Sequence, residues 1–105
     1  MTFNVTNRMG EMFTDPSSDV RSRVLDELEE HHDAEHPDVS LTHESEWCLS
    51  IFPGGLVVWE NVELDVEPRH LEGLTRSKVE ALWTLLSMGD VSTIERDAWR
   101  PGYGR

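Results

Sequence analysis

The chain has 105 residues, which is the length of one domain and enough to bury roughly two-thirds of its unfolded surface. Hydrophobic residues make up 37% of it and charged residues 29%, and this content of Leu, Val and Trp is too high for a disordered chain. The formal net charge of -12 argues against binding to nucleic acid or to an anionic membrane surface, because both would repel the protein.

The sequence also lacks the segments that mark membrane-spanning and secreted proteins, and it has too few cysteines for a disulfide or a cysteine zinc site. No stretch approaches the ~18 consecutive apolar residues of a membrane span, and the N-terminus lacks the basic head and apolar run of a secretory signal. Cys48 is the only cysteine, which excludes an intrachain disulfide and a thiolate zinc cage. We therefore expect a soluble, cytoplasmic protein.

The charge is concentrated in the middle of the chain. Residues 1–23 carry three acids and three arginines, and residues 69–105 carry six basic and five acidic groups. Residues 24–68 hold thirteen carboxylates and no Lys or Arg, so this block supplies the whole net charge. A solvated surface usually mixes charges of both signs, so this segregation favours a functional acidic surface over one that serves solubility alone.

The first predicted element is a helix over residues 16–33. Pro16 suits its first position, and Val20, Val24, Leu25 and Leu28 fall on one face. Pro37 ends the helix by about residue 35. The acids of this helix are concentrated in its C-terminal half, where the helix dipole disfavours anions. An unfavourable placement without visible compensation points to a functional surface.

An alternating pattern then predicts three antiparallel strands between residues 39 and 66, with a turn at residues 53–55. A two-residue hairpin at this turn would put Trp47, Leu49 and Ile51 on the same, core face as Leu56, Val58 and Glu60. The opposite face would carry Cys48, Ser50, Phe52, Val57, Trp59 and Asn61. This face is too aromatic for a solvated surface, so either the N-terminal segment with Phe3 and Val5 covers it or it binds a partner.

The last third of the chain predicts two helices. Thr75 is the expected N-cap of the first, Val79, Leu82, Trp83 and Leu86 form its apolar stripe, and Gly89 ends it. Asp90 caps a short second helix, and residues 100–105 are expected to be a flexible tail. The predicted fold is α+β in a single domain over residues 1–105: an N-terminal helix, a three-stranded antiparallel meander with room for a fourth, N-terminal strand, and two C-terminal helices packed on one face of the sheet.

The histidines of residues 31–43 are the candidate metal ligands. His32 and His36 have the i,i+4 spacing of two ligands on one helical face, and His43 follows, although Pro37 removes His36 from a regular helix. The alternative is that neutral histidines simply end an acidic helix, and we expect no bound metal or other cofactor. Catalysis has little support either, because Cys48 has no basic neighbour in sequence and no serine lies in a G-x-S-x-G elbow.

Three segments resemble a known group of proteins. The stretches GLVVWEN at 55–61, PRH at 68–70 and WRPGYG at 99–104 are similar to segments of small acidic bacterial proteins with no assigned activity. This resemblance covers about residues 35–104 and implies a shared fold without catalytic residues. A looser similarity in size, charge and architecture is to bacterial toxin-immunity proteins, which cover the basic active site of a toxin.

These observations predict a non-enzymatic acidic binding protein that engages a basic protein partner, in an inhibitor or immunity role. Its partner-binding residues are predicted to be Glu27, Glu30, Asp33, Glu35, Glu44, Glu46, Trp59, Glu60 and Asn61. The alternatives are a metal-binding protein that uses the His31–His43 cluster and a structural homodimer that uses the Trp59 face. We otherwise expect a monomer or a weak homodimer.

Overall fold

The computed structural model describes residues 2–30 and 38–104, which form a seven-stranded antiparallel sheet and three helices. The strands are β1 (Phe3–Thr6), β2 (Met12–Thr14), β3 (Val39–His43), β4 (Trp47–Phe52), β5 (Leu56–Asn61), β6 (Arg69–Leu71) and β7 (Arg100–Pro101). The helices are α1 (Ser18–Glu30), α2 (Arg76–Ser87) and α3 (Val91–Ile94). The predicted fold, with a three-stranded meander after an N-terminal helix, is therefore wrong.

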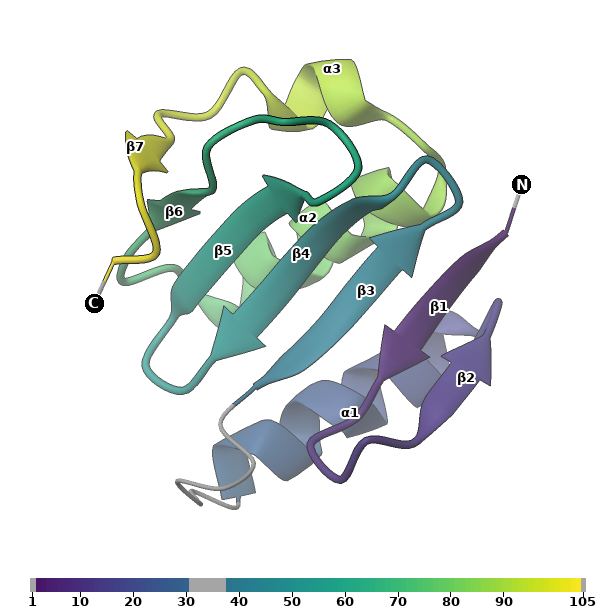
Figure 1. Ribbon diagram of the computed structural model, residues 1–105. Helices are drawn as coiled ribbons and strands as arrows, with labels where there is room; N and C mark the ends of the chain where they lie inside the picture. Colours follow the sequence, from purple (N-terminus) through teal and green to yellow (C-terminus); the bar gives the residue numbers. More distant parts are fainter. Residues whose placement is uncertain (1, 31–37, 105) are drawn as a thin grey trace.

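The N-terminal segment lies inside the sheet. The strands follow the order β2-β1-β3-β4-β5-β6-β7, and Val5 of β1 lies opposite Phe13 of β2 on one side and Leu41 of β3 on the other. Since β2 and β3 both run antiparallel to β1, they point the same way, and α1 makes the long crossing between them behind the sheet (Figure 1). Phe3 and Val5 thus extend the sheet and do not cover one of its faces.

The β4–β5 hairpin has the opposite face assignment from the predicted one. Leu49 lies opposite Trp59, and Ile51 lies opposite Val57. Phe52 is paired with Leu56, so the loop between them contains three residues, 53–55. Compared with a two-residue turn, the extra residue moves each side chain of β5 to the opposite face of the sheet. The corrected assignment has Val57, Trp59 and Asn61 on the core face and Leu56, Val58 and Glu60 on the opposite face.

All three helices pack on one face of the sheet, and the core lies between them and that face (Figure 1). The stripe predicted for α2 is confirmed, since Val79, Leu82, Trp83 and Leu86 are all buried. Thr75 caps the helix by accepting a hydrogen bond from the Lys78 amide, and Gly89 follows its end with φ of 75°. Within the described residues, no helix is both long and apolar enough to cross a bilayer.

The other face of the sheet, called here the open face, is covered on its β5–β6 side by the C-terminal segment. β7 pairs with β6, and the carbonyl oxygen of Gly102 lies 3.0 Å from Nδ1 of His70. The Tyr103 hydroxyl donates to the Glu60 carboxylate at 3.1 Å. Residues 100–104, predicted as part of a flexible tail, therefore have specific packing contacts with the sheet.

Candidate functional site

Trp59, the predicted exposed anchor, is fully buried. It lies on the core face of β5 and stacks on Trp47 and Trp99, with ring centroids 4.4 and 6.0 Å apart. Its indole Nε1 donates to the Glu95 carboxylate at 2.6 Å. A side chain without exposed surface cannot contact a partner, so the anchor role is wrong and a homodimer cannot use the face on which Trp59 lies.

Glu95 joins this aromatic cluster to β6, the strand next to β5. Arg69 of β6 donates to both oxygens of the Glu95 carboxylate, at 2.6 and 2.8 Å, in a bidentate pair. The hydrogen bonds from Arg69 and then from Trp59 lower the pKa of Glu95 and outweigh its partial burial, which acts in the other direction. The carboxylate is thus ionised and fully engaged, which identifies it as a structural group that holds β5, β6 and α3 together.

The acids of α1 are partly compensated by an arginine that is distant in sequence. Arg76, at the start of α2, contacts Asp26 at 3.0 Å and Glu29 at 2.9 Å, and it also donates to the Ser22 carbonyl at 2.8 Å. The acids at the unfavourable end of α1 therefore have a structural counterion, which weakens the inference that they mark a functional surface. Glu27 and Glu30 are exposed and have no ion-pair partner within residues 2–30 and 38–104.

The predicted partner-binding acids do not converge on one surface. Glu27 and Glu30 lie near the end of α1, which shares a pocket with the β4–β5 turn at the Val39 end of β3, whereas Glu44 and Glu46 follow the other end of β3. The five residues of β3 span at least ~13 Å at about 3.3 Å per residue, so the two pairs of acids lie at opposite ends of the sheet. Asp33 and Glu35 lie outside the described residues.

Glu44 and Glu46 instead belong to a surface that we call the acidic end. It consists of two neighbouring loops, residues 44–46 between β3 and β4 and residues 62–67 between β5 and β6. Its carboxylates belong to Glu44, Glu46, Glu63, Asp65 and Glu67, and neither loop contains a Lys or Arg. The side chains of Glu46, Glu63, Asp65 and Glu67 are exposed and make no ion pair with any other described residue.

Asn61 holds the two loops of the acidic end together. Its side chain is 2% exposed, so the residue predicted to bind a partner has a structural role. Its Nδ2 donates to the carbonyl of Ser45 at 3.1 Å, and its Oδ1 accepts from the amides of Glu63 and Leu64 at 3.0 and 3.1 Å. Glu60, also predicted to bind a partner, is half-buried on the open face and accepts the hydrogen bond from Tyr103.

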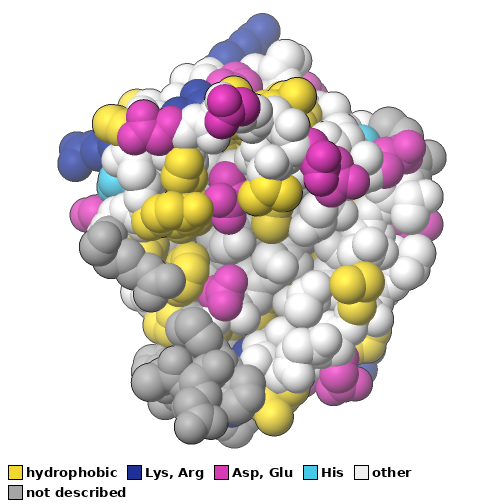
Figure 2. Space-filling view, in the orientation of Figure 1, with side chains coloured by type: hydrophobic (Ala, Val, Ile, Leu, Met, Phe, Trp, Pro, Cys, Tyr) yellow, Lys and Arg dark blue, Asp and Glu magenta, His cyan; other side chains and the backbone are white. Residues whose placement is uncertain are grey.

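The acidic end also exposes aliphatic side chains. Val62 is 80% exposed, Leu64 51% and Val66 45%, and each is followed along the chain by a carboxylate. The loop turns tightly here, with the amide of Val66 bonded to the carbonyl of Leu64. Figure 2 shows acidic and hydrophobic side chains side by side over the upper part of the molecule, where the two loops lie in Figure 1.

The exposure of these aliphatic residues is not evident from the sequence, because their alternation with acids predicts a strand. β5 ends at Asn61, and residues 62–67 form a loop in which both the apolar and the acidic side chains face solvent. Asn61 itself was the available signal, because an asparagine side chain often accepts hydrogen bonds from amides two and three residues later and so starts a turn.

Of the candidate metal ligands, only His43 lies among the described residues, and His32 and His36 lie outside them. His43 is 6% exposed, and its Nδ1 accepts from the Ser45 amide at 3.1 Å. Within the described residues, no three His, Cys, Asp or Glu side chains come close enough together to hold a metal ion.

Cys48 lies on the open face of β4. The Thr42 hydroxyl donates to its Sγ at 3.3 Å, and the Ser50 Oγ lies 3.7 Å away. Burial raises the pKa of the Cys48 thiol above its ordinary value. The thiol is therefore protonated at neutral pH, which makes it a poor nucleophile.

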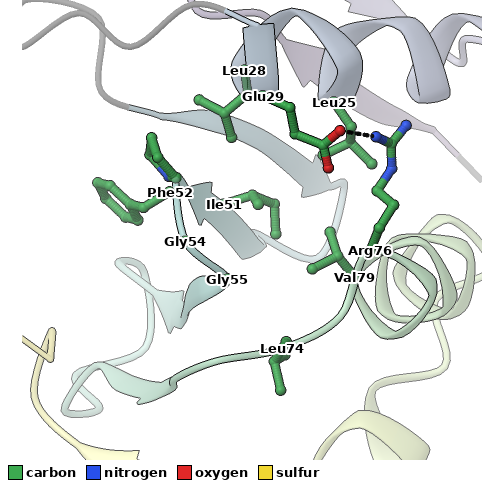
Figure 3. Close-up of a pocket in the computed structure, with 11 residues that line it drawn as sticks. Leu25, Leu28, Glu29, Ile51, Phe52, Gly54, Gly55, Leu74, Arg76 and Val79 are labelled. Carbon is green, nitrogen blue, oxygen red and sulfur yellow. Dashed lines mark hydrogen bonds and ion pairs between the residues drawn. The ribbon is translucent and has the colours of Figure 1, made fainter.

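A pocket of about 140 Å³ lies between α1, the β4–β5 hairpin and the first turn of α2 (Figure 3). Leu25 and Leu28 approach it from α1, Ile51 from β4, and Val79 from α2. The charged groups at its rim, Glu29 and Arg76, are paired with each other. The described lining thus offers apolar contacts without an unpaired charge that could orient a polar substrate.

Comparison of the chain with protein-family models, curated proteins and solved structures finds no match. The resemblance to small acidic bacterial proteins and to immunity proteins therefore stays a prediction, and the function has to be argued from the geometry.

Proposed function

We propose that this protein is a non-enzymatic binding protein of the cytoplasm whose acidic end engages a basic surface on a protein partner, in an inhibitor or immunity role. The observation that carries the proposal is the loop 62–67, in which Val62, Leu64 and Val66 are held exposed between three carboxylates that have no counterion among the described residues.

The two kinds of side chain would have different tasks in binding. Exposed carboxylates speed the encounter with a basic surface and discriminate against acidic ones, but they add little affinity where they stay solvated. Aliphatic groups that become desolvated in a contact supply affinity, at roughly 25 cal/mol per Å² of buried apolar surface. Aliphatic and acidic residues alternate on one loop that the Asn61 side chain holds in place. The acidic end can therefore offer an apolar contact that is ordered before binding and is flanked by carboxylates.

The proposal is tested by affinity capture from a lysate of the source organism with four baits. The wild type is compared with an apolar variant (Val62→Ser, Leu64→Ser, Val66→Ser) and a charge variant (Glu63→Gln, Asp65→Asn, Glu67→Gln). The control changes the same number and types of acid on α1 (Asp19→Asn, Glu27→Gln, Glu30→Gln). We expect a basic protein to bind the wild type and the control, and to be lost from both loop variants.

Calorimetry with the purified partner then separates the two contributions. The apolar variant should bind at least tenfold more weakly at every salt concentration, which corresponds to about 1.4 kcal/mol or more. The charge variant should bind more weakly at low salt and show a shallower salt dependence. The proposal is wrong if the wild type captures no basic protein, or if all four baits capture it equally.

A further inference from the structure

The outer edge of β2 has backbone groups without partners. The Asp15 amide donates to the Phe3 carbonyl at 2.8 Å, and the Asn7 amide donates to the Glu11 carbonyl at 2.9 Å. In an antiparallel ladder the bonding direction alternates, so the amide and carbonyl of Phe13 point toward β1 and those of Met12 and Thr14 point away from the sheet. β2 ends the sheet order, and no described strand pairs with its outer side.

The same edge exposes apolar side chains. Met12 is 65% exposed, Met9 in the preceding turn is 58% exposed, and Phe13 is partly exposed at the border of the core. A hollow of about 180 Å³ lies between β2 and α1, and Phe13, Val20 and Val24 form its apolar wall. An edge strand beside an apolar hollow can accept both the backbone and a side chain of an added strand.

The charge around this edge differs from that of the rest of the molecule. Residues 1–23 sum to zero, with three acids and three arginines, whereas residues 24–68 contain only acids. Beside β2, Arg8 lines one hollow together with Glu11 and Glu27, and Arg23 lines the other with Glu27. Two copies of so acidic a chain repel each other over most of their surface, but at this border Arg8 and Arg23 can offset the acids, Glu11 of one copy and Asp15 of the other, that pairing of the two edges brings together.

We propose that two copies of the chain associate by antiparallel pairing of their β2 strands across a two-fold axis at Phe13. Met12 would then lie opposite Thr14 of the partner subunit, and their outward amides and carbonyls would form the connecting hydrogen bonds. Phe13 would face Phe13 of the partner subunit on the helix side of the sheet and close the two hollows. A two-fold contact of this kind is self-complementary and makes one sheet continuous through both copies.

This contact is independent of the proposed binding at the acidic end and has the opposite salt dependence. Screening weakens the attraction between an acidic end and a basic partner, whereas it relieves the repulsion between two acidic copies. Dimerisation should therefore strengthen as NaCl is raised, so the failure of one proposal can be told apart from the failure of the other.

The test is sedimentation equilibrium of the full chain at about 10 µM to about 1 mM, a range that covers weak association of about -4 to -7 kcal/mol. We expect the mass to rise from 12.1 kDa toward twice that value, at lower concentration when the salt is higher. Met12→Lys places a charge on the exposed side chain next to the pairing groups, and Thr14→Pro removes an outward amide at an edge position that tolerates proline. Both variants should remain monomeric over this range.

Met88→Lys is the matched control, because Met88 is 55% exposed at the end of α2, a helix that offers no strand edge for pairing. It should dimerise like the wild type, and circular dichroism of all variants establishes that they are folded. A wild type that stays monomeric throughout the range overturns the proposal. So does a dimer that persists in both β2 variants while they keep their fold.

Discussion

At the scale of single residues, the Glu95 carboxylate at the end of α3 is bonded to both β5 and β6. Because Arg69 and Trp59 lower its pKa in the folded protein, the unfolded chain holds this proton more tightly. The stabilisation is therefore present above the ordinary pKa of 4.5 and is lost as the pH falls through the lowered, folded value. The side chains of Arg69 and Glu95 are 30% and 34% exposed, so solvent screening places the contribution at about 1 to 2 kcal/mol.

We predict that Glu95→Gln lowers the free energy of unfolding by about 1 to 2 kcal/mol at pH 7, and that this difference from the wild type shrinks as the pH falls below 4.5. Urea denaturation at a series of pH values measures it. Glu67→Gln, which removes an exposed and unpaired acid, is the control and should change stability by less than about 0.5 kcal/mol. A difference for Glu95→Gln that stays constant down to pH 3 would contradict the assignment.

The conformation of the acidic end depends on the buried side chain of Asn61. Asn61→Ala removes the acceptor of the Glu63 and Leu64 amides, so we predict that their hydrogen exchange becomes roughly fivefold to tenfold faster, as the loss of about 1 kcal/mol implies. Amide exchange followed by nuclear magnetic resonance measures both sites.

Asn7 provides a matched control at the other end of the sheet order. Its Oδ1 accepts from the amides of Met9 and Glu11, two and four residues later, at 3.0 and 2.9 Å. Asn7→Ala should therefore accelerate exchange at Met9 and Glu11 and leave Glu63 and Leu64 unchanged. Equal acceleration at both loops in either variant would show general destabilisation and not the loss of a local cap.

At the scale of elements, the sequence predicts helices better than strand pairing. α2 follows from signals within its own fifteen or so residues, because a cap, a 3.6-residue stripe and a terminal glycine all act locally. The side of the sheet on which Trp59 lies depends on the number of residues in one turn, which alternation alone does not determine. The short strands β2, β6 and β7 have two or three residues each, and they are fixed by partners far away in the chain.

The β4–β5 turn contains two neighbouring glycines, for which we predict different losses of stability on substitution by alanine. Gly54 and Gly55 have φ of 84° and 82°, but a Cβ at Gly54 meets no atom within 4 Å, whereas one at Gly55 would lie 2.5 Å from the Leu74 carbonyl oxygen. Gly54→Ala should cost only the conformational strain of about 1 to 2 kcal/mol. Gly55→Ala should cost more, because it also displaces the Leu74 amide from its 3.0 Å hydrogen bond to the Gly55 carbonyl.

Thermal and urea denaturation of the two glycine variants provide the comparison, and each is the other's control. Equal destabilisation by both substitutions would mean that the backbone of residues 73–74 moves away without cost, and that the β4–β5 turn is not anchored on the segment before α2.

At the scale of the whole molecule, the sequence locates the charge but not the surface that the charge forms. The acidic block of residues 24–68 is evident from the positions of the charged residues in the sequence. The partial neutralisation of its α1 group by Arg76 follows from contacts between residues about 50 positions apart, and the acidic end follows from the contact of Asn61 with Ser45. Exposure of Val62, Leu64 and Val66 follows from where β5 stops, so this half of the candidate site could not be derived from charge patterning.

The excess of 21 acidic over nine basic side chains also sets how the fold should respond to salt. Raising NaCl from about 0.01 M to about 1 M shortens the Debye length from about 30 Å to about 3 Å, which removes repulsion between separated carboxylates. The same screening weakens the ion pairs of Arg69, Arg76 and Lys78, but these are few and are in direct contact. We therefore predict that the melting temperature rises by several degrees, since about 1 kcal/mol corresponds to roughly 4–8 °C in a domain of this size.

The charge variant of the acidic end shows where that repulsion lies. With Glu63, Asp65 and Glu67 neutralised, the protein should melt at a higher temperature than the wild type at low salt, and its further rise with NaCl should be smaller. The apolar variant of the same loop keeps every charge and should retain the full salt dependence, which makes it the control in differential scanning calorimetry. A melting temperature that falls with NaCl would mean that direct ion pairs outweigh the repulsion, and that the acidic end is not an unbalanced concentration of charge.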